Sequence, residues 1–252
     1  MSGFRLDMRG VSHRFGTLDV LSDISIGVRP GEFVSILGPS GAGKSTIFRL
    51  LTGGLKTGTG DVLFDGTPLT KDRRPFAFMP QRDALMPWRR IVDNVTLGLE
   101  VQGVKRREAR ERVLPLFDEF GLSGFENSYP AQLSGGMRQR ASLLRTVVQE
   151  RPMLLLDEPF GALDALTRAG MQRWLAGMWS QHCWTALLIT HDVREAVHLS
   201  DRIYVLSPRP ARVIHEIDIS LARPRASTGP AHAEAAALEA FILNLLLNPE
   251  EG

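Results

Sequence analysis

Residues Gly38–Thr46 read GPSGAGKST, which fits the pattern Gly-x-x-x-x-Gly-Lys-Ser/Thr. In loops of this pattern, backbone N–H groups surround phosphate oxygens, the lysine reaches the β- and γ-phosphates, and a hydroxyl binds Mg²⁺. Glycines let the backbone approach the anion, and a helix that starts near Lys44 directs the positive end of its dipole at the phosphates. The alternative interpretation is an ordinary glycine turn before a helix.

The residues on either side of this loop occur in the order that a phosphate loop requires. Glu32–Leu37 (EFVSIL) is an apolar run of strand length that leads directly into the loop. After the loop, Ile47, Phe48, Leu50 and Leu51 recur on one face at helical spacing. The sequence therefore predicts a strand, a phosphate loop and a helix in succession.

Composition limits the class of protein. A chain of 252 residues can bury a core without disulfides, as one large domain or one core with an insertion. Its 30 basic and 28 acidic residues give a net charge of +2, which does not favour nucleic acid as a partner. The only cysteine, Cys183, suits a reducing compartment and is interpreted as a buried or incidental thiol.

No signal-peptide core and no run of about 18 apolar residues is present, so we expect a cytosolic chain that spans no membrane.

The order of apolar runs predicts three kinds of region. Short strands come first, a helical region follows from Ile91 to Phe120 and from Gly136 to Glu150, and alternating strands and helices follow Pro152. The charge run Lys105–Arg112 is interpreted as a solvated helix face. The early strands are expected at Phe4–Val11, Asp23–Val28, Glu32–Leu37, Asp61–Phe64 and Pro75–Met79.

The later elements are expected as the strands MLLLD, TALLIT and IYVLS and as helices at Ala165–His182, Val193–Leu199 and Ala231–Leu247. The last helix is expected to pack with its apolar side, formed by Leu238, Phe241, Ile242, Leu245 and Leu246, on the body or on a subunit rather than in a membrane. Pro224–Pro230 (PRASTGP) is the linker candidate.

Two carboxylates end the apolar run Met153–Glu158 (MLLLDE). Beside a phosphate loop, Asp157 can hold Mg²⁺ through water together with Ser45, and Glu158 can orient or deprotonate the attacking water. Taken alone, the same residues would indicate only a salt bridge at a strand end.

A second glycine motif, LSGGM at Leu133–Met137, completes a set that resembles the nucleotide-binding subunit of an ABC transporter from about residue 4 to residue 220. The resemblance implies an α/β P-loop NTPase (RecA-like) core with an antiparallel β subdomain and an inserted α-helical subdomain. It implies a nucleotide-binding domain over residues 1–225, with its helical subdomain at about 88–150, and a tail helix at 226–252. Met137 stands where glutamine is commoner in the family.

The resemblance also implies ATP hydrolysis with ATP and Mg²⁺ as cofactors, and a homodimer with two composite sites. In the family, the residues at Ser134, Gly135 and Gly136 close on the γ-phosphate held by the other subunit, which a helix N-terminus can do. Asp164, in GALD, resembles the residue that senses the opposite site.

Three further positions resemble functional residues of the family. Gln81 looks like the glutamine that contacts Mg²⁺ and the attacking water, and His191 like the histidine that hydrogen-bonds the γ-phosphate; a structural histidine is the alternative. Phe15 stands where an aromatic residue stacks on adenine, unless it is a core phenylalanine.

The complete prediction assigns catalysis to Glu158, His191, Gln81 and Lys44, and metal binding to Ser45, Gln81 and Asp157. Nucleotide binding is assigned to Phe15, Gly38, Pro39, Ser40, Gly41, Ala42, Gly43, Lys44, Ser45, Thr46, Ser134, Gly135 and Gly136.

Residues 82–94 follow Gln81 where the family receives the coupling helix of a membrane permease. Leu85, Met86 and Trp88 are candidates for a docking groove, and an internal hydrophobic staple is the rival interpretation. The triplet MPW resembles ATPase subunits of importers for nitrate, sulfonates, taurine and pyrimidine precursors of thiamine.

These features imply a peripheral subunit on the cytoplasmic face of the inner membrane, with permease subunits as direct partners and an extracytoplasmic solute-binding protein as an indirect partner. The alternatives are an ATPase subunit of an exporter or lipid-transport complex, or a soluble ABC ATPase.

Overall fold

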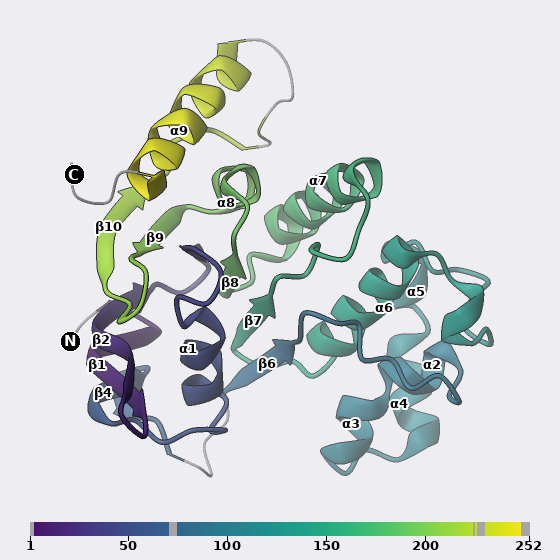
Figure 1. The fold of residues 1–252 in the computed structure, drawn as a ribbon. Helices are drawn as coiled ribbons and strands as arrows, with labels where there is room; N and C mark the ends of the chain where they lie inside the picture. The colour runs from purple at the N-terminus through teal and green to yellow at the C-terminus, as the bar shows by residue number, and fades with distance from the viewer. Residues whose placement is uncertain (1–2, 71–74, 224, 226–229, 248–252) are drawn as a thin grey trace. The chain divides into compact units, whose positions relative to one another are not determined.

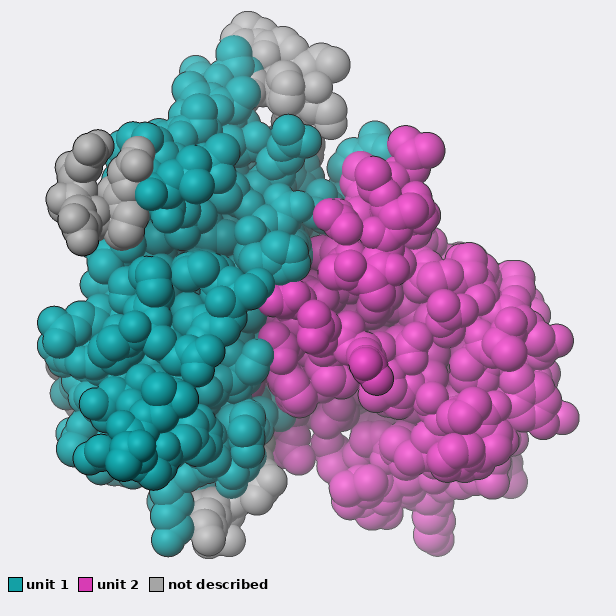
Figure 2. Space-filling view, in the orientation of Figure 1, with its two compact units in different colours: residues 1–76, 172–252 teal, residues 77–171 magenta. Residues whose placement is uncertain are grey.

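The computed structural model describes residues 3–70, 75–223, 225 and 230–247. The chain forms two compact units (Figures 1 and 2). Unit 1 consists of Met1–Phe76 and Gln172–Gly252, and unit 2 consists of Ala77–Met171. Each unit is described by itself.

Unit 1 contains an antiparallel sheet with the strand order β2-β1-β4-β5. These strands are β1 (Leu6–Phe15), β2 (Leu18–Val28), β4 (Thr59–Phe64) and β5 (Thr67–Pro68). β1 and β2 pair as far as Phe15 and Leu18, around a tight hairpin. The strands were expected to be shorter because the hairpin end is solvent-exposed and lacks the apolar pattern that marks a strand.

A second sheet in unit 1 has the order β10-β9-β3-β8. Its strands are β3 (Phe33–Leu37), β8 (Ala186–Thr190), β9 (Arg202–Leu206) and β10 (Val213–Asp218), and β10 alone is antiparallel to its neighbour. Every residue of β3, β8 and β9 is buried, as expected for parallel strands at the centre of an α/β unit. Leu37 is in register with both Thr190 and Val205, so these three strands end at one edge.

The helices of unit 1 include α1 (Lys44–Leu51), α8 (Val193–Leu199) and α9 (Pro230–Leu247), while α7 (Ala165–His182) begins in unit 2 and continues into unit 1. α9 follows β10 along the chain and lies above it in Figure 1. Its Ile242 and Leu245 are buried, and Ile242 packs in a core that includes Val197 and Val205. Phe241 does not pack on the body, because its side chain is 53% exposed, and its packing on a subunit stays a prediction.

The segment between β10 and α9 is not simply a linker. Arg225 is buried, and its guanidinium donates hydrogen bonds to the carbonyls of Val197 and Ser200 at the end of α8. Burial lowers the pKa of Arg225 to about 10. The rest of the predicted linker, except Pro230, lies outside the described residues.

Unit 2 contains β6 (Phe76–Met79, whose first residue belongs to unit 1) next to β7 (Met153–Asp157). Its helices are α2 (Ile91–Val95), α3 (Leu97–Val101), α4 (Arg106–Val113), α5 (Leu116–Glu119), a 3₁₀ turn (Pro130–Gln132) and α6 (Gly135–Val147). The predicted helical region is therefore divided into short helices. Gly103, with a φ of 91°, and Pro115 lie at two of the breaks.

The charge run on α4 is solvated on only one side. Arg107 and Arg112 form exposed pairs with Glu111 and Glu108, as expected. Arg106 and Arg110 instead hydrogen-bond to Asp93 of α2, which is 4% exposed. Burial alone would raise the pKa of Asp93, but hydrogen bonds from Arg106 and Arg110 lower it below its usual value.

Cys183 is exposed, so the buried alternative for its thiol is wrong. Over the described ranges, no helix combines the length and apolarity needed to cross a membrane.

Candidate functional site

The predicted phosphate loop connects the buried strand β3 to α1, which begins at Lys44. Gly41 and Gly43 have φ values of 80° and 111°, in the left-handed region that favours glycine. A Cβ on Gly43 would lie 2.9 Å from Val20 Cγ1 and 3.0 Å from Leu21 Cδ2. Only glycine fits this position, so the loop stays narrow where it turns into the helix.

Lys44 lies folded over the loop. Its side chain is 5% exposed, and its Nζ donates hydrogen bonds to the carbonyl oxygens of Gly38, at 2.7 Å, and Pro39, at 3.0 Å. The backbone of the loop thus holds the ammonium group beside its own N–H groups, which is an arrangement suited to an anion. Ser45, the predicted Mg²⁺ ligand, is exposed at the start of α1.

His191 lies at the same edge of the parallel sheet as the phosphate loop. The loop follows Leu37 and His191 follows Thr190, and these two preceding residues are register partners. The turn at His191 is fixed because the N–H of Asp192 donates to Thr190 Oγ1, which in turn donates to Glu195 Oε2 at 2.6 Å. Sheet register and turn contacts therefore place an exposed imidazole beside the loop.

Phe15 lies at the β1–β2 hairpin with its ring 40% exposed. The ring meets His13 edge-on, at 4.7 Å between centroids, and Arg49 Cζ of α1 lies 6.0 Å from its centroid. The exposure argues against the core alternative and leaves a ring face that can accept a base.

In unit 2, Gln81 and Glu158 are joined directly. Gln81 Nε2 donates a hydrogen bond of 3.0 Å to Glu158 Oε2, and the two residues follow the neighbouring strands β6 and β7. Glu158 has a φ of 43°, a backbone conformation uncommon for a residue with a side chain and often found at functional sites. Asp157, the last residue of β7, precedes it.

The second glycine motif forms the start of α6. Ser134 is the N-cap, and its Oγ accepts a hydrogen bond from the N–H of Met137 at 3.3 Å. A Cβ on Gly136 would lie 2.9 Å from Thr167 Cγ2 at the start of α7, so glycine allows these two helices to approach. Because Met137 contributes a backbone group, the departure from glutamine leaves the cap intact.

Residues 21–161 match the family described as ABC transporter. The chain belongs to this family. It is an ATP-binding, ATP-hydrolysing cassette, and its cofactors are ATP and Mg²⁺.

Similar proteins cover almost the whole cassette. The aliphatic sulfonates import ATP-binding protein 2 of Pseudomonas aeruginosa is 44% identical over 249 residues, covering 99% of this chain and 87% of the relative. The aliphatic sulfonates import ATP-binding protein 1 of Rhodococcus jostii is 46% identical over 220 residues, covering 87% of this chain and 85% of the relative.

Solved structures confirm the predicted fold class. A dimeric ATP-binding cassette in a post-hydrolysis state, bound to ADP and Pi, matches with a TM-score of 0.71 and 28% identity, over 85% of this chain and 98% of that chain. A cassette from Clostridium perfringens, part of an ABC transporter complex, has a TM-score of 0.75 at 24% identity, over 98% of this chain and 97% of that chain, and shows the fold alone.

The cassette's predicted site residues fall into two sets. Phe15, the loop Gly38–Thr46 and His191 lie in unit 1, while Gln81, Asp157, Glu158 and the residues Ser134, Gly135 and Gly136 lie in unit 2. The structure brings members of each set together within one unit. Their combined action on one nucleotide remains a prediction.

Sequence reasoning missed the arginines that fasten the segment after Gln81 to α6. Arg138 Nε donates to Asp83 Oδ2 at 3.1 Å, and Arg145 donates to the carbonyl oxygens of Asp83 and Ala84 at 2.6 and 2.7 Å. Burial lowers the pKa of Arg145. The two arginines are seven residues apart, which places them on one helix face but does not identify Asp83 as their partner.

The outcomes for Asp164, Leu85 and Trp88 differ. Asp164 Oδ1 accepts a hydrogen bond from the N–H of Thr167 at the start of α7, and hydrogen bonds from the side chain and N–H of Thr167 lower the pKa of Asp164. Leu85 is 8% exposed, so its placement in a docking groove is wrong, whereas Trp88 is 74% exposed.

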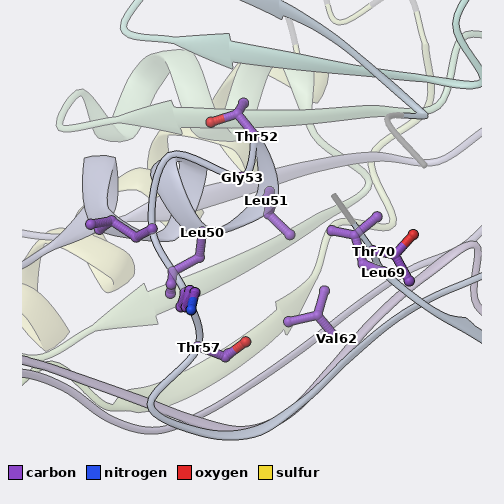
Figure 3. Close-up of a pocket in the computed structure, with 10 residues that line it drawn as sticks. Leu50, Leu51, Thr52, Gly53, Thr57, Val62, Leu69 and Thr70 are labelled. Atoms are coloured by element: carbon purple, nitrogen blue, oxygen red, sulfur yellow. The ribbon is translucent and has the colours of Figure 1, made fainter. Parts of the chain in front are cut away.

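A cavity of about 200 Å³ lies at the far end of α1 from the phosphate loop (Figure 3). Leu50 and Leu51 of the last helical turn, Val62 of β4 and Leu69 line it. It is separate from the predicted nucleotide-binding residues of unit 1.

Proposed function

We propose that this cassette energises the uptake of a small anionic solute of the aliphatic sulfonate class through a membrane permease. Identity of 44% over 99% of the chain to a protein named for aliphatic sulfonate import carries the proposal. Taurine, which the MPW triplet also suggests, is itself an aliphatic sulfonate, while nitrate and thiamine-precursor pyrimidines are the other solutes that the triplet suggests.

In the proposed mechanism, the loop Gly38–Thr46 and Lys44 bind the phosphates, and Phe15 stacks on adenine. Ser45, Gln81 and Asp157 hold Mg²⁺, which neutralises charge on the phosphates when it is bound. Glu158 orients and deprotonates the attacking water, and His191 donates a hydrogen bond to the γ-phosphate. The 3.0 Å contact between Gln81 and Glu158 supports a shared role at the attacking water.

The cassette acts as a homodimer in this proposal. Ser134 is exposed at the N-terminus of the 13-residue helix α6, where its hydroxyl and the helix dipole are available to an anion. The nucleotide held by one subunit would lie against Ser134, Gly135 and Gly136 of the other. Hydrolysis would then separate the two subunits.

Trp88 provides the proposed contact with the permease. It borders a cavity of about 460 Å³, together with Tyr129 and the arginines Arg90, Arg106 and Arg110. An exposed tryptophan beside arginines has the composition of a protein-binding hot spot. This contact would hold the cassette at the cytoplasmic face of the membrane as a peripheral subunit, with the solute delivered by an extracytoplasmic binding protein.

The proposal is tested by identifying the permease and a solute-binding protein, for example from neighbouring reading frames, and reconstituting the cassette with them. The binding protein is first screened by thermal shift against alkanesulfonates, taurine, nitrate and a pyrimidine precursor of thiamine. We expect an alkanesulfonate to stabilise it and to be taken up with ATP by vesicles containing the wild-type cassette. Stabilisation by nitrate or the pyrimidine precursor alone would overturn the solute assignment, and ATP-driven efflux would overturn the direction.

A further inference from the structure

The turn that follows β9 lies against the phosphate loop. A Cβ on Gly38 would lie 3.1 Å from Leu206 Cβ, at the end of β9. A Cβ on Gly41 would lie 3.0 Å from Arg209 Nη2 and 4.0 Å from Arg209 Cζ. The guanidinium group of Arg209 therefore rests beside the glycine in the middle of the loop.

Hydrogen bonds hold this turn in place. The N–H of Ser207 donates to the carbonyl of Arg212, and the N–H of Arg212 donates to Ser207 Oγ, both at 3.0 Å. Ala211 exchanges backbone hydrogen bonds of 2.9 Å with β2, donating to Val20 and accepting from Ser22. Since Val20 also packs on Gly43, the turn, β2 and the phosphate loop form one arrangement within unit 1.

The side chain of Arg209 is exposed and, in the part of the chain that the structure describes, makes no hydrogen bond or ion pair. Arg202, on the preceding strand, is by contrast paired with Glu32 and Glu216. A guanidinium cation beside a loop of backbone N–H groups, which carry partial positive charge, is electrostatically unfavourable when the loop is empty. Such a placement becomes favourable when an anion with several acceptor oxygens occupies the loop.

We propose that Arg209 is a further nucleotide-binding residue, whose guanidinium group donates hydrogen bonds to a phosphate oxygen of the nucleotide held by the loop. It supplements Lys44, whose ammonium group is already directed at the loop carbonyls. This inference rests on the proposed phosphate-binding role of the loop. It adds a phosphate ligand from the turn between β9 and β10.

The test measures equilibrium binding of ATP and of ADP to the full chain at concentrations where it is monomeric. Arg209→Gln keeps much of the side-chain length and removes the charge, Arg209→Lys keeps the charge, and Arg212→Gln removes an exposed arginine of the same turn. We expect Arg209→Gln to bind ATP about 10-fold more weakly, at the lower end of the effect of a charge-assisted hydrogen bond. Arg209→Lys should retain most of the affinity, and Arg212→Gln should bind as the wild type does.

A loss for ATP alone would assign the contact to the γ-phosphate, and a loss for ATP and ADP would assign it to an inner phosphate; either supports the proposal. Unchanged affinity in Arg209→Gln would overturn it, as would an equal loss in Arg212→Gln, which would indicate a general effect of surface charge. Lys44→Ala separates the two proposals: if this variant binds ATP like the wild type, the role of the loop itself is wrong. Thermal melting of each variant checks that the chain remains folded.

Discussion

The two units hold their predicted site residues by different means. In unit 1, the phosphate loop and His191 follow fully buried strands whose register places both at one edge of the sheet. In unit 2, Gln81 and Glu158 also follow neighbouring strands, but a side-chain hydrogen bond joins them, and Arg138 and Arg145 hold the segment at Asp83 through further side-chain hydrogen bonds. Backbone register makes a rigid binding surface, whereas side-chain contacts suit residues whose contacts change during turnover.

The comparison predicts that a change in the phosphate loop of unit 1 lowers nucleotide affinity, whereas changes at Glu158 and Ser134 of unit 2 lower turnover and assembly. Lys44→Ala should weaken ATP binding by at least about 10-fold, because it removes charged hydrogen bonds to the phosphates. Glu158→Gln keeps the size of the side chain and an oxygen that accepts hydrogen bonds, so this variant should bind ATP normally. Its turnover should fall by about 100- to 10,000-fold, the range for a general base. Equilibrium binding and single-turnover hydrolysis distinguish the two effects.

Glu111→Gln, which changes an exposed carboxylate of unit 2, is the control for Glu158→Gln and should hydrolyse ATP at the wild-type rate. Wild-type turnover in Glu158→Gln would contradict the proposal that Glu158 orients and deprotonates the attacking water. A loss of ATP affinity in Glu158→Gln as large as that in Lys44→Ala would remove the distinction between the units.

The second prediction concerns assembly. In a Glu158→Gln background, ATP should convert the monomer into a dimer that is visible by light scattering. Adding Ser134→Arg should weaken that dimer by about 3 kcal/mol, the upper part of the range for overfilling a close contact, because the long side chain intrudes where α6 meets the nucleotide. Binding of ATP by the monomer should not change, and an unchanged dimer would refute contact of Ser134 with the partner's nucleotide.

The sequence predicted most of unit 1 because its strands are short apolar runs and its loop has a specific pattern. It predicted the helical nature of unit 2. It did not predict the breaks at Gly103 and Pro115, where glycine and proline have low helix propensity. The contacts of Asp83 with Arg138 and Arg145 join residues about 55 to 62 positions apart, which no local pattern reveals. Leu85 and Trp88 looked alike in sequence, and only burial separates them.

The third prediction tests the difference in burial between Leu85 and Trp88. Trp88→Ala should weaken permease association by about 2 kcal/mol or more, the size of a hot-spot contact, without lowering the melting temperature. Leu85→Ala should instead destabilise unit 2 by about 2–5 kcal/mol, as for other buried leucines. Val101→Ala, at an apolar side chain of unit 2 that is 81% exposed, is the control for both. A large fall in melting temperature with normal permease binding would show that Trp88 is structural.

The smallest expected effect tests the side-chain contacts that stabilise unit 2. Asp93→Asn should lower the free energy of unfolding at pH 7 by about 1–3 kcal/mol, because the charged hydrogen bonds to Arg106 and Arg110 are weakened. The pKa of Asp93 is lowered in the folded chain, so its stabilisation is complete above the ordinary pKa of about 4 and is lost as the pH falls through the folded value.

Wild type and Asp93→Asn should therefore converge in urea unfolding as the pH falls below about 4. Glu111→Gln removes an exposed ion pair from the same helix α4 and should change stability by less than about 1 kcal/mol at any pH. Affinity for ATP should be unchanged in both variants, since the phosphate loop belongs to unit 1. A difference between wild type and Asp93→Asn that does not depend on pH would mean that packing, rather than the carboxylate charge, holds α2 to α4. Charged side-chain contacts would then not be what stabilises unit 2.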